Sequence, residues 1–219
     1  MKAVIIGNTQ FSSLLLQYVS DAGIDVAAFA ADREYIEEGT LDALPVVPID
    51  ELPARFDTEE YKLIMGIGYK KLGETRKVIF ERCKEYGYDF INYIHPSAVV
   101  DRSVLTGEGN IIFENVTIQK RTVMGDGNIL FSNCALMHDN VVGNFVTFGA
   151  GSVSNGSVHI GDCCFIGSNA TLRDRITIKD HILIGAGTYV ERDCEAGTAV
   201  LPGVRNYIRD GAARMESGL

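Results

Sequence analysis

His138 and Asp139 follow one another in the chain and are of residue types that can take part in proton transfer. An imidazole changes charge near neutral pH, so it can take a proton from an acceptor amine or hydroxyl, and a neighbouring carboxylate can fix its tautomer. Three other histidines compete for this role. His95 stands beside a proline and is interpreted as structural, whereas His159 and His181 fall in predicted turns near acidic residues, where exposed charge pairs are expected. On the residues alone, His138 is one candidate general base among four.

A six-residue repeat must position this pair. From Ile94 to Leu201 the chain divides into eighteen consecutive units without insertion, and their first and fifth positions are almost entirely apolar or small. Only Thr106 and Ser154 are polar at first positions. A strict short period predicts a stacked parallel β-solenoid, because each unit buries its apolar positions only against those above and below. Three flat faces per turn give six coils, a stack roughly 29 Å tall at about 4.8 Å per strand.

Glycine and cysteine both follow the repeat. We expect the glycines at second positions to supply corner conformations that a side chain would penalise. These glycines are Gly107, Gly125, Gly143, Gly149, Gly161, Gly167, Gly185 and Gly197. The five cysteines are odd in number and lack CxxC spacing, so neither a disulfide framework nor a metal site is expected.

Before the repeat, strands and helices alternate. The predicted elements are strands at Lys2–Gly7, Asp25–Ala31, Leu63–Gly68 and Phe90–Tyr93 and helices at Phe11–Ala22 and Gly73–Tyr86. The segment between Arg33 and Tyr61 contains three prolines and is expected to be irregular, with one helical turn at Asp50–Leu52. This order predicts a small parallel sheet with helices on its faces. We therefore divide the chain into an α/β domain at 1–93, a solenoid at 94–205 and a tail at 206–219.

Ligands of such sheets bind at the carboxyl ends of the strands. Those ends carry the candidate binding residues Gly7, Asn8, Thr9, Gln10, Asp32 and Gly68. The first loop could hold a phosphate at the start of the following helix, but GxGxxG is absent, which argues against a dinucleotide. Asp32 is placed to accept hydrogen bonds from a ribose or base, or it simply caps its loop.

Charge and hydropathy exclude other classes. The formal net charge is −9 and no basic tract occurs, so nucleic-acid binding has little electrostatic support. No apolar run of membrane-spanning length and no signal-peptide pattern is present, so we expect a cytoplasmic protein without membrane insertion.

Two stretches, Tyr93–Val100 and Ile129–Phe145, carry a family likeness. Over residues 1–204 the chain resembles the sugar acyltransferases that include sialic acid O-acetyltransferases and bacterial N-acetyltransferases of nucleotide-linked amino sugars. The resemblance implies a Rossmann-like domain, a left-handed β-helix of hexapeptide repeats, a homotrimer and acetyl-coenzyme A as donor. It implies that His138 removes the acceptor's proton and that Asp139 raises its basicity. The implied coenzyme contacts are Thr147, Gly156, Ser168 and Ala186.

The chain departs from the family in three places. Its first loop lacks the usual Gly-x-Gly-Gly-His, Phe131 stands where an asparagine is common, and Leu201-Pro202-Gly203-Val204 replaces the usual Gly-x-Pro-Ala. The resemblance favours an acetyl-coenzyme A-dependent N-acetyltransferase of a nucleotide-linked amino sugar. Sugar O-acetylation remains an alternative, and so does a non-catalytic trimeric scaffold or ligand-binding protein.

Overall fold

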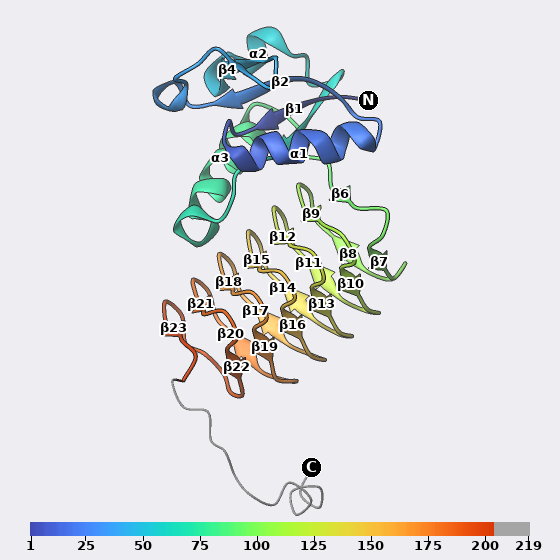
Figure 1. Cartoon of the computed structure of the whole chain (residues 1–219), viewed down its shortest axis with the longest axis vertical. Helices are drawn as coiled ribbons and strands as arrows, with labels where there is room; N and C mark the ends of the chain where they lie inside the picture. Colours follow the sequence, from blue (N-terminus) through green and yellow to red (C-terminus); the bar gives the residue numbers. More distant parts are fainter. Residues whose placement is uncertain (204–219) are drawn as a thin grey trace, which may run out of the picture.

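An α/β domain leads directly into a three-sided solenoid in the computed structural model, which describes residues 1–203 without the side chain of Leu105 (Figure 1). The elements of the first domain are β1 (Lys2–Ile6), α1 (Gln10–Asp21), β2 (Asp25–Ala31), β3 (Thr40–Leu41), β4 (Leu44–Pro48), α2 (Leu52–Arg55), β5 (Tyr61–Met65) and α3 (Glu74–Glu85), with 3₁₀ turns at Arg33–Tyr35, Ile49–Glu51 and Lys70–Gly73. They form one sheet in the order β3-β4-β2-β1-β5. β1, β2, β4 and β5 are parallel, and β3 runs antiparallel to β4.

The expected strands and helices of this domain are present, with two corrections. The segment expected to be irregular contains β4, which pairs with β2 through the buried residues Val46 and Val47. The expected strand at Phe90–Tyr93 is divided: Phe90 forms only a bridge to Leu63, and Tyr93 begins the first strand of the solenoid.

The solenoid strands are two residues long and lie in three parallel sheets, the arrangement expected for a left-handed β-helix. The β6 sheet contains β6 (Tyr93–Ile94), β9 (Ile111–Ile112), β12 (Ile129–Leu130), β15 (Thr147–Phe148), β18 (Phe165–Ile166), β21 (Leu183–Ile184) and β23 (Ala199–Val200). The β7 sheet contains β7 (Val99–Val100), β10 (Thr117–Ile118), β13 (Ala135–Leu136), β16 (Val153–Ser154), β19 (Thr171–Leu172) and β22 (Tyr189–Val190). The β8 sheet contains β8 (Leu105–Thr106), β11 (Val123–Met124), β14 (Val141–Val142), β17 (His159–Ile160) and β20 (Thr177–Ile178).

First and fifth positions fill the solenoid interior, as the repeat predicts. Ile112, Leu130 and Phe148 are fully buried, and so is Val146 at a fifth position. Fifth positions also carry asparagines that the sequence reading did not include. Asn110, Asn128 and Asn140 are fully buried, and their side-chain amides donate hydrogen bonds to carbonyls of their own and the next coil. Buried polar groups are tolerated when they are paired in this way.

The reason expected for the second-position glycines is wrong for seven of the eight. Of this set only Gly197 has a left-handed backbone. The others lack a side chain because the next coil approaches too closely: a Cβ at Gly107 would lie 2.0 Å from Asp126 Oδ1, and one at Gly125 2.2 Å from Asn144 Oδ1. The left-handed conformation instead falls on every fourth position from residue 109 to residue 187, with φ between 53° and 70°.

The repeat also shortens at its end. Paired strands are eighteen residues apart as far as Val190, but Leu183 then pairs with Ala199 and Ile178 bridges Cys194, a step of sixteen residues. The expectation of eighteen unbroken units is therefore wrong in the last coil, and Ala196 is exposed in a turn rather than buried.

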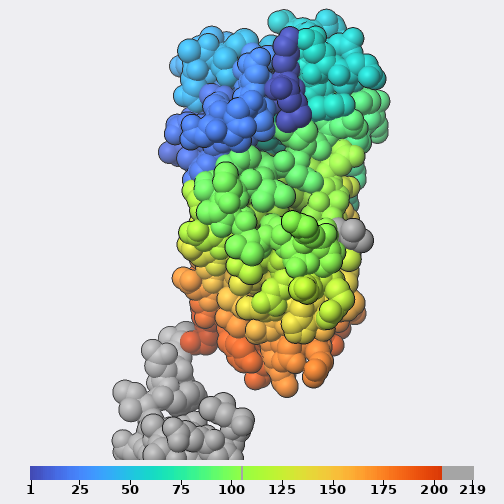
Figure 2. Space-filling model, turned by 90° about the vertical axis from the view of Figure 1, so that its right-hand side faces the viewer, coloured from blue at the N-terminus to red at the C-terminus, as the bar shows by residue number. Residues whose placement is uncertain are grey.

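The first domain sits at the start of the solenoid (Figure 2). Its core residues pack along the β6 sheet. Phe11 of α1 contacts Phe113 and Phe131, and Phe80 of α3 contacts Phe145 with ring centroids 5.4 Å apart. The β7 and β8 sheets receive no such cover from this domain in the contacts of the described residues. Within residues 1–203, no helix has the length and apolar character needed to cross a membrane.

Candidate functional site

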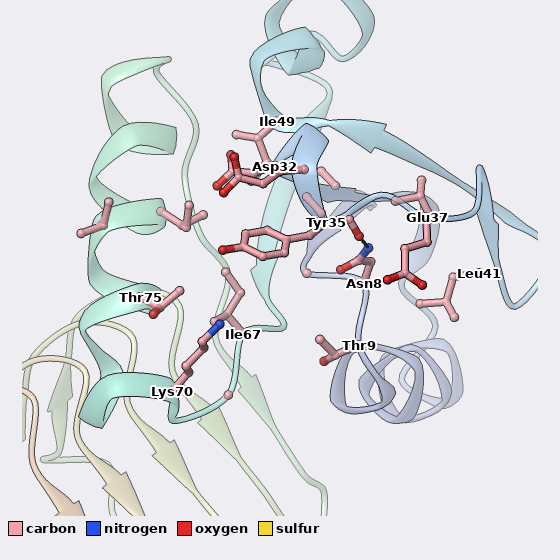
Figure 3. A pocket seen from close by; sticks show the side chains of 18 of the residues that line it. Asn8, Thr9, Asp32, Tyr35, Glu37, Leu41, Ile49, Ile67, Lys70 and Thr75 are labelled. Atoms are coloured by element: carbon pink, nitrogen blue, oxygen red, sulfur yellow. Dashed lines mark hydrogen bonds between the residues drawn. The ribbon is translucent and has the colours of Figure 1, made fainter.

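A cavity of about 900 Å³ opens at the carboxyl ends of β1, β2 and β5, between α1 and α3 (Figure 3). This volume suits a small-molecule ligand. Five of the six candidate binding residues line it: Gly7, Asn8, Thr9, Asp32 and Gly68. Gln10 is the first residue of α1 and is not among the lining residues.

The first loop is tight enough to require glycine at one position. Gly7 has φ +120°, and a Cβ there would lie 2.7 Å from Ser12 Oγ. Ser12 Oγ donates to the Gly66 carbonyl at 3.0 Å and accepts from the Thr9 N–H at 3.1 Å. This network fixes the N-terminal end of α1 beside the cavity, where its positive dipole end favours an anion.

The cavity wall carries charges of both signs. Asp32 forms an ion pair with Arg82 of α3, and its side chain is 29% exposed. Lys70 Nζ lies 5.5 Å from the centroid of the Tyr35 ring, and the Tyr35 carbonyl accepts a hydrogen bond from Asn8 Nδ2 at 2.7 Å. The sequence reading missed Tyr35, because it lies in the segment expected to be irregular.

The His138–Asp139 pair lies on the corner between the β7 and β8 sheets. His138 Nδ1 is 2.7 Å from Asp139 Oδ2, and Arg121 binds both oxygens of that carboxylate at 2.5 and 2.7 Å. The Arg121 guanidinium, and then His138, hold the pKa of Asp139 well below its usual range. A proton on Nδ1 donated to this carboxylate leaves Nε2 as the nitrogen that can accept a proton.

Arg121 was missed in the sequence, although the repeat contains the signal. It stands eighteen residues before Asp139, which places the two side chains one above the other on consecutive coils. Gly156 stands eighteen residues after His138. A Cβ on Gly156 would lie 2.6 Å from His138 Cε1, so the imidazole rests on a surface that only glycine leaves open.

The four residues implied for coenzyme binding are divided over the solenoid. Gly156 lies beside His138, whereas Ser168 and Ala186 are exposed on the corner between the β6 and β7 sheets. Thr147 does not lie with either group, because it is 1% exposed and its hydroxyl accepts from Arg76 Nη2 at 3.1 Å. The first domain therefore covers Thr147, which is not open to a ligand in this chain.

Arg76 of α3 joins the two domains. Its fully buried guanidinium donates to the carbonyls of Gly68 at 2.9 Å and Phe145 at 2.8 Å. Burial lowers the pKa of Arg76 to about 9. Because Gly68 lines the cavity and Phe145 belongs to the solenoid, this side chain fixes one cavity wall against the coils.

One chain does not bring the cavity and the His138–Asp139 pair together. The cavity belongs to the domain that covers the β6 sheet, whereas His138 lies on the corner opposite that sheet. The two domains do pack against each other, but on the face away from His138. Each chain thus presents two separate parts of a possible site.

Comparisons with known proteins found no matching family model. In sequence, the chain is 34% identical over 114 residues to a GDP-perosamine N-acetyltransferase of Escherichia coli O157:H7. That match covers 52% of this chain and 51% of the relative, so it spans about half the length of that protein.

In structure, the chain is similar to a mutant of perosamine N-acetyltransferase from Caulobacter crescentus, with one histidine replaced by asparagine, in complex with CoA and GDP-perosamine. The TM-score is 0.84 at 26% identity, covering 96% of this chain and 98% of that chain. The acetyltransferase domain of PglB from Neisseria gonorrhoeae, in complex with acetyl coenzyme A, shares the fold with a TM-score of 0.81 at 22% identity, over 91% of this chain and 95% of that chain.

Proposed function

We propose that the chain is a member of the hexapeptide-repeat sugar acyltransferase family and that it transfers an acetyl group from acetyl-coenzyme A to the amine of a nucleotide-linked amino sugar. The likeness to N-acetyltransferases that act on GDP-perosamine supports an amine acceptor over a hydroxyl and over a non-catalytic scaffold. A cytoplasmic location remains part of the proposal.

The observation that carries the proposal is the arrangement around His138. Nδ1 faces a carboxylate that Arg121 keeps ionised, and the ring is seated on Gly156. In the proposed reaction the acceptor amine attacks the thioester carbonyl, forming a C–N bond, and His138 Nε2 takes the amine proton. The C–S bond then breaks, and the proton passes to the departing coenzyme A sulfur.

Asp139 and Arg121 are proposed as positioning residues. The carboxylate holds the ring in the tautomer with a free Nε2 and stabilises the imidazolium that forms when the proton arrives. Arg121 holds the carboxylate in turn, through a bidentate pair of the geometry that guanidinium and carboxylate favour. Backbone amides near Gly156 and Ala186 are proposed to contact the pantetheine and to polarise the thioester carbonyl.

The cavity of the first domain is proposed to bind the nucleotide sugar. Lys70 and the N-terminal end of α1 supply positive potential for a diphosphate, while Asp32 can accept hydrogen bonds from the ribose or base. Gly7, Asn8 and Thr9 would lie against the diphosphate, and Gly68 would close the opposite side.

A homotrimer is proposed because the cavity and His138 lie apart within a single chain. The faces that flank His138 carry uncovered apolar side chains: Val99 and Tyr189 on the β7 sheet are 65% and 61% exposed, and Val123 and Val141 on the β8 sheet are each 41% exposed. Burying these faces between copies would set the His138 corner of one chain against the cavity of the next.

Mixed oligomers test both parts of this proposal. The His138→Asn variant keeps the cavity, and a Thr75→Trp variant fills the cavity but keeps His138. Each alone should lose activity, measured as coenzyme A thiol released from acetyl-coenzyme A with GDP-perosamine; the His138 variant should lose roughly 10² to 10⁴ in kcat. If the chains are unfolded together, mixed in equal amounts and refolded, about one quarter of the sites should combine two intact parts.

Recovery of about one quarter of the wild-type activity would therefore support a shared site. No recovery, from mixtures that light scattering finds to be trimeric, would mean that both parts must come from one chain. Near wild-type turnover by the His138→Asn variant alone would remove His138 from the mechanism.

A further inference from the structure

A column of left-handed residues runs down the corner between the β8 and β6 sheets and faces α3. Its members are the fourth positions Gly109, Gly127, Phe145, Cys163 and His181, one from each coil. The upper part of the column packs against Phe80 of α3. The lower part, Cys163 and His181, meets Glu74 in the first turn of the same helix.

Three different metal-binding side chains converge where this column meets α3. Glu74 Oε1 lies 2.6 Å from His181 Nε2, and the Cys163 Sγ joins them, so that all three ligand atoms lie within 4.8 Å of one another. Cys163 is fully buried, whereas His181 is exposed. The cluster therefore has a fixed inner ligand and a side that an ion can reach from solvent.

We propose that Glu74, Cys163 and His181 form a binding site for a divalent transition-metal ion of the zinc class. Zinc takes thiolate at about 2.3 Å and imidazole or carboxylate at about 2.0–2.2 Å, usually in a tetrahedron. Such bond lengths put neighbouring ligand atoms roughly 3.3–3.8 Å apart. The His181–Glu74 pair reaches this spacing when its hydrogen bond opens by about 1 Å, and Cys163 Sγ lies within 4.8 Å of both ligand atoms.

The choice of metal follows from the ligand set. Sulfur and imidazole nitrogen select zinc and its softer neighbours, whereas magnesium and calcium prefer oxygen alone. One thiolate and one carboxylate also balance the double positive charge of the ion, which suits a half-buried place. Three protein ligands leave a fourth position for water or another small ligand.

The site would serve as an additional connection between the domains and goes beyond the proposed acetyl transfer. Glu74 comes from the first domain and lines the cavity, and the other two ligands belong to the solenoid. Such a site cannot be recognised from residue spacing in the sequence, because Cys163 and His181 are one coil apart and Glu74 is in another domain. The sequence expectation of no metal site rested on the absence of close cysteine spacing.

Zinc binding to the tag-free full chain tests the proposal. After equilibrium dialysis against zinc, elemental analysis should find one ion per chain in the wild type. Cys163→Ser, His181→Ala and Glu74→Gln should each weaken the dissociation constant from titration calorimetry by at least about 100-fold, more than the loss typical of ligand-supporting residues. His159→Gln, an exposed histidine on the β8 sheet, is the matched control and should bind as the wild type does.

Cobalt substitution identifies the ligands separately. The wild type with Co²⁺ should show a thiolate-to-cobalt charge-transfer band and the visible bands of a four-coordinate ion, and Cys163→Ser should lose the charge-transfer band. Equal zinc affinity in the wild type and in the exposed-site variant His181→Ala, with both folded by circular dichroism, would overturn the proposal. So would zinc content in the wild type no higher than in Cys163→Ser. Neither readout depends on acetyltransferase activity.

Discussion

Replacing Gly156 with alanine tests whether the His138 ring must lie where the structure has it. The added Cβ would stand 2.6 Å from Cε1 and 2.8 Å from Nε2, whereas ordinary van der Waals contact begins at 3.4 Å. The ring must therefore move by about 0.8 Å, the difference between 3.4 and 2.6 Å. A misplacement near 1 Å can cost about 10²-fold in rate, so we expect kcat to fall roughly 10- to 100-fold.

Stability should change little in the same variant. The backbone at Gly156 is not left-handed, and the His138 side chain is 56% exposed, so the ring can swing toward solvent without a loss of core packing. We expect a change in the free energy of unfolding within about 1 kcal/mol, as for most surface substitutions. Gly39→Ala is the matched control, because a Cβ there meets nothing within 4 Å and its activity should be unchanged.

The assay is kcat at saturating acetyl-coenzyme A and acceptor, measured for Gly156→Ala in the wild type and in a His138→Ala background. Without the imidazole the clash disappears, so the glycine substitution should have no further effect there. A wild-type kcat for the single variant would refute the reasoning. An equal loss in both backgrounds would show that Gly156 acts without the His138 ring.

Three further predictions follow from contacts elsewhere. The Tyr18 hydroxyl of α1 donates to Glu114 of the solenoid, and this bond, then burial, raises the pKa of Tyr18 to about 12. Since the unfolded tyrosine loses its proton near pH 10, the contribution of this bond to stability is complete below that pH and is lost as pH rises toward 12. The free energy of unfolding measured with urea should therefore fall more steeply over this range in the wild type than in Tyr18→Phe. Tyr189→Phe, at an exposed site, should follow the wild type. Arg76→Met should lower the free energy of urea unfolding by about 2–5 kcal/mol, because it leaves the buried carbonyls of Gly68 and Phe145 unpaired. Arg175→Met, at a side chain 83% exposed, should change this free energy little. Equal losses in the two variants would contradict a stabilising role of Arg76 between the domains. Asp32→Ala should raise KM for the nucleotide sugar by about tenfold and leave KM for acetyl-coenzyme A unchanged, and an equal rise in both would indicate damage to the fold instead.

The sequence predicts those parts of the fold that depend on a local period. First positions must stack on first positions, so the buried column through Ile112, Leu130 and Phe148 follows directly from the repeat. The shortened last coil could not be predicted, because Ala196 and Gly197 are of the residue types expected at the first and second positions of a six-residue unit. β4 was not predicted from the sequence, because Pro45 and Pro48 are its second and last residues and prolines normally interrupt strands.

Site contacts between residues eighteen positions apart could have been predicted from the sequence. Contacts between the two domains could not. Arg121 meets Asp139 because eighteen residues make one turn, which is simple arithmetic once the coil length is known. Arg76 meets Phe145 across two domains, and no periodicity relates these residues. The same is true of the separation between the cavity and His138, which depends on the sheet that the first domain covers. The roles of the site residues remain predictions.

The coil length is constant as far as Val190, so positions up to that residue are spaced at fixed intervals along the solenoid axis. Coils rise by about 4.8 Å, so Ser168 and Ala186 lie roughly 8 and 13 Å farther along the axis than His138. Those intervals are set by chain length alone, and no side chain can adjust them. A long, extended coenzyme laid along the axis would therefore have its reactive end placed by counting coils. Loss or gain of one eighteen-residue coil between His138 and Ser168 would leave the interior packing intact, yet would shift that end by about 4.8 Å, several times the misplacement that acyl transfer tolerates.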